Sequence, residues 1–231
     1  MKVIIVLAFV SLAYANVVPS AIEGNTAYGY IQNHAIPLAE EIRQAEEQMN
    51  KERIVVITAA HCWFDGVNQA WLINVVLGAN TIFFGGTRIE TSAIAVHLNW
   101  TPLLARNDVA VIYLPTAVTL SDLISPIALP SGSQLTEDFA GSTGTASGFG
   151  LTSTDGGIST SQTLSHVNLP IISNTMCSFA FPFLIQSSNI CTSGLGNVGT
   201  CRGDSGGPLA VTRNAFARIT SFIDFFNQHI Q

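Results

Sequence analysis

Three short motifs bring together a histidine, an aspartate and a serine, the residue types of nucleophilic catalysis. The motif Thr-Ala-Ala-His-Cys places His61 directly after an apolar run, and Arg-Asn-Asp-Val-Ala places Asp108 just before another. The motif Cys-Arg-Gly-Asp-Ser-Gly-Gly-Pro places Ser205 among glycines. A serine hydroxyl becomes an effective nucleophile when an imidazole takes its proton, and a carboxylate can hold that imidazole in the right tautomer. The motifs therefore indicate acyl-transfer chemistry.

Together the motifs resemble those of the chymotrypsin-like serine proteases, and the order His, Asp, Ser along the chain is the order of that family. The resemblance runs over residues 58–209 and again over about 215–230. It implies a serine endopeptidase in which His61 is the base, Asp108 orients it and Ser205 is the nucleophile. No cofactor and no metal site are expected.

The resemblance also assigns the groups around the nucleophile. Backbone N–H groups of Gly203 and Ser205 would form the oxyanion hole, and glycine at 203 permits the close backbone approach that this requires. The residue six before the serine forms the base of the primary specificity pocket in this family, and here it is Gly199. A preference for Lys or Arg would need an acid at that position. Gly199 therefore implies a chymotrypsin-like or broad preference for apolar side chains.

The N-terminal residues have the pattern of a secretory signal. Lys2 precedes an apolar run over residues 3–12, and Ala-Tyr-Ala at residues 13–15 matches a signal-peptidase site. We expect residues 1–15 to be removed. A membrane anchor is the alternative, and it is disfavoured because the run is shorter than the roughly 20 residues of a spanning helix. Secretion into an extracellular compartment that permits disulfides follows.

Residues 36–53 have the period of an amphipathic helix, with apolar residues spaced by four, three and four. The whole segment 16–53 resembles the acidic propeptide of digestive serine proteases. Cleavage after Arg53 by an activating trypsin-like protease would free the amine of Ile54. In the family that amine inserts beside the aspartate that precedes the nucleophile, here Asp204, and orders the oxyanion hole. The chain is therefore expected to be made as a zymogen.

A rival register takes Ile-Glu-Gly-Asn at residues 22–25 as the mature N-terminus, because it lies at a plausible distance from His61. Ala21 is the wrong residue for a trypsin-type activator to cleave after. In this register a charged helix would also have to replace β-strands. Cleavage after Arg53 is the favoured interpretation.

From Ile54 onward the sequence changes to short apolar runs broken by Gly, Ser, Thr, Asn and Pro, which is typical of an all-β fold. The resemblance specifies two six-stranded antiparallel β-barrels with a C-terminal helix from about Thr220. The predicted strands cover residues 54–57, 71–77, 91–98, 109–114, 143–148 and 167–172.

Two parts of that fold are missing from the sequence. The first strands of the N-terminal barrel have no room between Ile54 and the histidine motif. Near Asn214 the chain lacks the strand that walls the specificity pocket and pairs with substrate backbone. Residues 54–231 are fewer than the roughly 200 to 250 of comparable one-domain β-proteins. The alternative to an active enzyme is therefore a catalytically impaired homologue, a defective isoform or an incomplete gene model.

Four cysteines allow three pairings. The resemblance implies a disulfide between Cys177 and Cys191, across a short helix and loop. The family partners of Cys62 and Cys201 fall in the two missing parts. We therefore expect one disulfide and two unpaired thiols.

The composition and net charge of the chain exclude some kinds of binding partner. With 48% hydrophobic residues, 10% charged residues and a net charge of −6, the chain is neither disordered nor suited to nucleic acid or anionic membranes. From Ile54 onward it has five Arg and no Lys, so activity should persist at high pH. Asn99 begins a glycosylation sequon.

Three segments, at residues 171–174, 186–191 and 198–201, are most similar to those of insect digestive chymotrypsins. This resemblance implies that the substrates are proteins or peptides, that the protein acts in a gut lumen and that it is a monomer.

Overall fold

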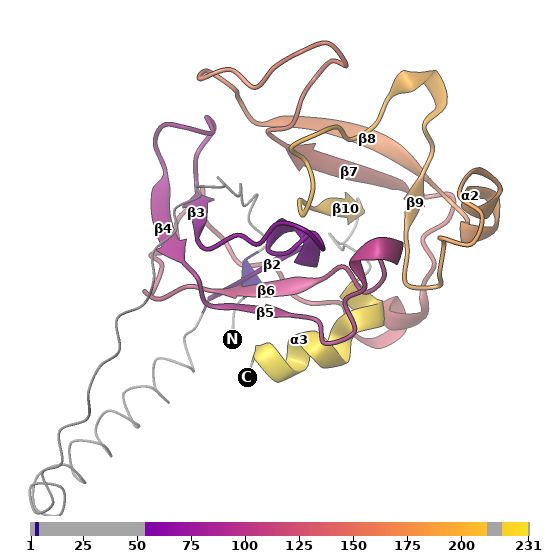
Figure 1. Cartoon of the computed structure of the whole chain (residues 1–231), viewed down its shortest axis with the longest axis horizontal. Coiled ribbons are helices and arrows are strands. Elements are labelled where there is room, and N and C mark those ends of the chain that lie inside the picture. The colour runs from indigo at the N-terminus through magenta and orange to yellow at the C-terminus, as the bar shows by residue number, and fades with distance from the viewer. Residues whose placement is uncertain (1–2, 5–53, 212–218, 231) are drawn as a thin grey trace, which may run out of the picture.

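The computed structural model describes residues 3–4, 54–211 and 219–230. The predicted propeptide and its helix lie outside these residues, as does the predicted signal apart from Val3 and Ile4. The described chain consists of strands, two short α-helices and several 3-10 turns (Figure 1). The prediction of an all-β fold with a C-terminal helix is confirmed. No helix in the described ranges is long and apolar enough to cross a bilayer.

The first sheet has the strand order β1-β2-β6-β5. β2 (Val55–Thr58) lies antiparallel to β6 (Ala110–Tyr113), which pairs in turn with β5 (Ile94–Val96). All four residues of β2 are buried, which explains why its sequence is a continuous β-branched run and not an alternation. β1 (Val3–Ile4) adds a short parallel pairing to the outer edge of β2.

The second sheet is the antiparallel pair β3 (Ile73–Leu77) and β4 (Thr87–Thr91). The inward residues of β3 alternate with half-buried ones and pack on Ile54 and Val56 from the first sheet. One strand was expected over residues 91–98, but the chain breaks there into β4 and β5. Thr91 explains the break, because its hydroxyl accepts the N–H of Ala93 and donates to the Tyr113 carbonyl, which stabilises a turn.

The third sheet has the order β10-β7-β8-β9 and forms the second half of the molecule (Figure 1). Its strands are β7 (Thr143–Gly148), β8 (Ser165–Ile172), β9 (Cys191–Thr192) and β10 (Leu209–Val211). The predicted strand over 143–148 is found with the same limits. Among the described residues, the buried cluster of this half is small and consists of Phe139, Ile171 and Val211, with Ile190 packed against it.

The C-terminal residues form a 3-10 turn (Ile219–Phe222) followed by α3 (Ile223–His229). Figure 1 shows this helix beneath the first sheet, far along the chain from the strands it covers. Phe225 and Phe226 are buried there and belong to one cluster with Val55, Ile57 and Val111. The end of the chain therefore completes the core of the first half.

Candidate active site

The pairing of β2 with β6 brings His61 and Asp108 to one edge of the first sheet. Thr58 at the end of β2 lies opposite Ala110 at the start of β6. His61 follows β2 in a 3-10 turn (Ala60–Cys62), and Asp108 is separated from the start of β6 by Val109 alone. Two residues 47 positions apart in the chain become neighbours because their strands are antiparallel partners.

Asp108 binds His61 through both carboxylate oxygens. Its Oδ2 lies 2.6 Å from His61 Nδ1, and its Oδ1 accepts the His61 backbone N–H at 2.8 Å. The side chains stay partly accessible, with exposed fractions of 36% for His61 and 25% for Asp108. The carboxylate thus fixes both the ring and the turn that carries it, and it makes no bond to Nε2.

These contacts change the proton affinity of the imidazole. The hydrogen bond to Asp108, and next the one to Cys62, raise the pKa of His61 from 6.5 to about 10, while partial burial opposes them. In the free protein the ring therefore keeps its proton above neutral pH.

A tight turn at Asn107 positions Asp108. Asn107 has a φ of +56°, in the left-handed region that asparagine tolerates better than most residues. Its side-chain amide donates to the carbonyl of Asn99, and this bond anchors the turn. The sequence-predicted Asp108 is thus held by its neighbour as well as by its own hydrogen bonds.

Ser205 comes from the other half of the molecule, in the loop before β10. The Asp204 carboxylate anchors this loop, because it accepts the N–H groups of Gly150 and Cys201, each at 2.9 Å. The Cys62 thiol donates to the Ser205 carbonyl at 3.6 Å. The Thr58 hydroxyl contacts the Gly206 carbonyl at 3.5 Å. The structure thus brings the loop of Ser205 against the turn of His61.

The serine hydroxyl itself does not reach the histidine. Ser205 is exposed, and within the described residues its Oγ has no hydrogen bond to His61. The hydrogen-bond contact of His61 Nε2 is instead with Cys62 Sγ, at 3.8 Å. The motifs indicated all three predicted residues, but not this thiol contact. The signal was available in the sequence, since Cys62 adjoins His61 and lacks its family partner.

The loop of Ser205 needs glycine at two positions. Gly203 has a φ of +96°, and a Cβ on it would lie 3.0 Å from the Gly150 Cα. Gly206 has a φ of +77°, and a Cβ on it would lie 2.4 Å from the Thr58 hydroxyl. No described residue accepts a hydrogen bond from the backbone N–H of Gly203 or of Ser205. Both donors are therefore available to a ligand.

Two cavities lie near these groups. One of about 350 Å³ is lined by His61, Asp108 and Arg106 and extends to Phe226 of α3. Another, of about 480 Å³, runs along β7 and β8 and is lined by the predicted pocket residue Gly199. Gly199 has open space where a side chain would be, and Asp204 lines the same cavity. Ser205 lines neither of these two cavities.

The predicted activation residues are not brought together in this chain. Arg53 lies outside the described residues. Ile54 is buried beside β2, in a cluster with Val56 and Ile73, while the Asp204 carboxylate is bonded to Gly150 and Cys201. The meeting of Ile54 with Asp204 remains a prediction about the cleaved chain.

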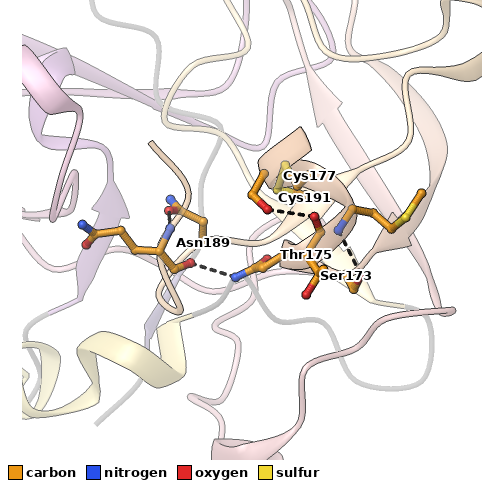
Figure 2. Close-up of a disulfide and its surroundings, with 9 residues drawn as sticks. Ser173, Thr175, Cys177, Asn189 and Cys191 are labelled. Carbon is orange, nitrogen blue, oxygen red and sulfur yellow. Dashed lines mark hydrogen bonds between the residues drawn. A yellow bond between two sulfur atoms is a disulfide. The ribbon is translucent and has the colours of Figure 1, made fainter. Parts of the chain in front are cut away.

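The predicted disulfide is present. Cys177 in α2 (Asn174–Ala180) is bonded to Cys191 in β9, with a Cα–Cα distance of 6.1 Å (Figure 2). Figure 2 also shows Ser173 at the start of α2, where its hydroxyl accepts the N–H of Met176. The other two cysteines, Cys62 and Cys201, are free thiols. Within the described residues no group of three or more His, Cys, Asp or Glu is placed to hold a metal ion.

Known proteins are similar to this chain over most of its length. A family model described as Trypsin matches residues 49–229. Brachyurin from Leptuca pugilator is 36% identical over 192 residues, which cover 74% of this chain and 80% of that protein. Chymotrypsin from Phaedon cochleariae is 30% identical, with 75% of this chain and 68% of that protein covered.

Collagenase is also similar, both in sequence and in solved structure. Collagenase from Hypoderma lineatum is 34% identical, and the match covers 73% of this chain and 62% of that protein. A solved structure of HL collagenase superimposes with a TM-score of 0.67 at 30% identity and covers 75% of this chain and 81% of that one. The likeness thus holds for sequence and for fold.

Proposed function

Because the chain belongs to the trypsin family of serine endopeptidases, we propose that His61, Asp108 and Ser205 are its catalytic triad. The observation that carries this proposal is the two-point bond between Asp108 and His61 at the edge where the Ser205 loop docks. The fold supplies each residue from a different segment. The same three residues carry the family motifs.

The mechanism follows the family scheme. Ser205 Oγ attacks the peptide carbonyl while His61 Nε2 takes its proton and later gives it to the leaving amine. Asp108 keeps the Nδ1 proton in place and stabilises the imidazolium. Substrate binding has to bring the exposed serine hydroxyl to Nε2, and such catalytic bonds often tighten only in the complex.

The free N–H groups of Gly203 and Ser205 suit the oxyanion of the tetrahedral intermediate. Each lacks an acceptor among the described residues. A single donor of this kind contributes about 2.7 to 4 kcal/mol to transition-state stabilisation.

Gly199 suits substrates with apolar side chains before the cleaved bond. No acid at this position is available to pair with Lys or Arg, and the cavity beside Gly199 is open. Chromogenic peptides that differ only in this side chain test the preference. We expect Phe or Leu to be cleaved at least about 100-fold faster than Arg, since Gly199 offers a cation no partner and the Asp204 carboxylate on the cavity wall is already bonded to Gly150 and Cys201. Equal rates would contradict the assignment.

Secretion, activation and a digestive role complete the proposal. Residues 1–15 would direct secretion to an extracellular space such as a gut lumen, and residues 16–53 would be removed by a trypsin-like protease acting after Arg53. The digestive assignment rests on the resemblance to digestive chymotrypsins. N-terminal sequencing of secreted protein before and after trypsin treatment tests these steps. A first residue other than Ile54 after treatment contradicts this activation site.

An active-site phosphonate tests the triad directly. After trypsin treatment the phosphonate should add to Ser205, and mass spectrometry of the peptide that contains it locates the adduct. The matched control is Ser205→Ala, which should take up no label. Absence of an adduct on the wild-type serine would sink the claim of activity.

A catalytically impaired homologue is the second candidate. Two observations favour it: His61 Nε2 contacts a thiol and not Ser205, and His61 keeps its proton at neutral pH. The missing strands point the same way. Sequencing of the natural transcript separates the cases, because recovery of the missing strands and two more cysteines would assign the defect to the gene model.

A further inference from the structure

Three side chains contact one another in series, in the order Cys62, His61 and Asp108. Cys62 Sγ lies 3.8 Å from His61 Nε2, and His61 Nδ1 lies 2.6 Å from Asp108 Oδ2. The sulfur therefore occupies the side of the ring that a serine hydroxyl must reach. The thiol is half-buried and lies at the surface where the two halves of the molecule meet.

The sulfur is packed against the loop of the proposed nucleophile. It lies 3.6 Å from the Ser205 carbonyl, and a Cβ on Gly206 would come within 2.9 Å of it. Any atoms added to Cys62 Sγ therefore have to occupy space next to both His61 Nε2 and Ser205.

We propose that Cys62 is a modification site for low-molecular-weight disulfides, and that the mixed disulfide formed there separates His61 from Ser205. Cys62 loses its proton to water, and its sulfur attacks one sulfur of the disulfide. The S–S bond of the reagent breaks, and the departing thiolate takes up a proton. One thiol is exchanged for another, so no further oxidant is needed.

The neighbouring imidazole favours this reaction. A ring that keeps its proton above neutral pH presents a positive charge to the sulfur as the thiol ionises, and sulfur nucleophiles next to such a cation react faster. Cys201 is the natural comparison within the same molecule, because it is also a free, half-buried thiol and its sulfur has no hydrogen bond to a histidine among the described residues.

Mass spectrometry after exposure to oxidised glutathione tests the site. The full chain, with Cys177–Cys191 intact, is sampled over time and digested, and glutathione on each free thiol is quantified. We expect Cys62 to react about tenfold faster than Cys201 at neutral pH. In the variant His61→Gln the Cys62 rate should fall to that of Cys201. Equal rates in the wild type, or a Cys62–Cys201 disulfide in place of the mixed one, would overturn the proposal.

The loss of activity that follows when the mixed disulfide separates His61 from Ser205 is measured in a second experiment. This part of the proposal rests on the proposed function. Peptide hydrolysis by the trypsin-treated protein should fall in step with the modification of Cys62 and return with dithiothreitol. The variant Cys62→Ser should be insensitive to oxidised glutathione. Modified protein that keeps full turnover would show that the mixed disulfide does not separate His61 from Ser205. The mass measurement decides whether Cys62 is the modified residue, whether or not the chain is an active protease.

Discussion

At the scale of single residues, Asp108 constrains His61 twice. One oxygen holds the ring and the other holds the backbone N–H. Asp108→Asn should therefore lower kcat by about 10⁴-fold, because an amide no longer fixes the productive tautomer. It should also bring the pKa of His61 down from about 10 toward 6.5. NMR titration of the ring and peptide kinetics measure the two effects.

Glu90→Gln is the matched control for this change, since Glu90 is exposed on β4 and remote from the site. It should leave both quantities unchanged. An unaltered His61 titration in Asp108→Asn would refute the role assigned to the carboxylate.

The raised pKa of His61 also gives activity and stability opposite pH dependences. Activity should increase as pH rises toward about 10, because the ring must be neutral to act as a base. Unfolding lowers the pKa to 6.5, so the stabilising contribution is complete below pH 6.5 and is lost as pH rises through about 10. The charged and titratable neighbours are Asp108, Cys62 and, across the shared cavity, Arg106.

The difference in melting temperature between wild type and His61→Gln isolates the stability effect from other titrations. It should shrink between pH 6.5 and 10. The midpoint of activity should move to lower pH in Cys62→Ser, because Cys62 is the second largest cause of the raised pKa. A profile that is flat above neutrality would contradict the shift.

The identities of the three proposed catalytic residues were easier to predict than the contacts between them. The motifs named His61, Asp108 and Ser205 because nucleophilic catalysis restricts residue types strongly. They could not show that the Ser205 hydroxyl stays apart from Nε2, because that depends on how the loop of Ser205 meets the turn of His61.

At the scale of elements, α3 is fixed by its aromatic residues. Phe226 is fully buried against β2 and β6, and also lines the cavity beside Asp108. Phe226→Ala should lower the free energy of unfolding by about 3 to 5 kcal/mol, through lost burial and a new cavity. Urea denaturation measures the change.

Asn227→Ala provides the comparison, because Asn227 is exposed on the same helix. It should change stability by no more than about 0.5 kcal/mol. Similar losses in both variants would mean that α3 is not packed as described.

The positions of β2 and β6 followed from β-branched runs and that of β7 from a short segment between turn residues, and all three were predicted within one or two residues. The break between β4 and β5 was not, because it depends on the hydroxyl of Thr91 bonding across to Tyr113. The pairing of Val3–Ile4 with β2 was not expected either. Both depend on contacts between segments distant in sequence, which local patterns do not contain.

At the scale of the whole molecule, the two halves have unequal cores. The first half contains two buried clusters and all three tryptophans, Trp63, Trp71 and Trp100. In the part of the second half that the structure describes there are one small cluster and the disulfide. During urea unfolding, far-UV circular dichroism should therefore start to change before tryptophan fluorescence, because only the first half contains the fluorophores. Reduction of the disulfide Cys177–Cys191 should widen the difference in urea concentration between the two transitions. Coincident transitions would instead show that the molecule unfolds as one cooperative unit.

The position of α3 also has a consequence for synthesis of the protein. Phe225 and Phe226 close the core over β2 and β6, although about 110 residues of chain separate them from β6. A ribosome that has produced the first half has therefore made a sheet whose apolar face is still uncovered. That face stays open to water, and to other chains, until the last helix emerges.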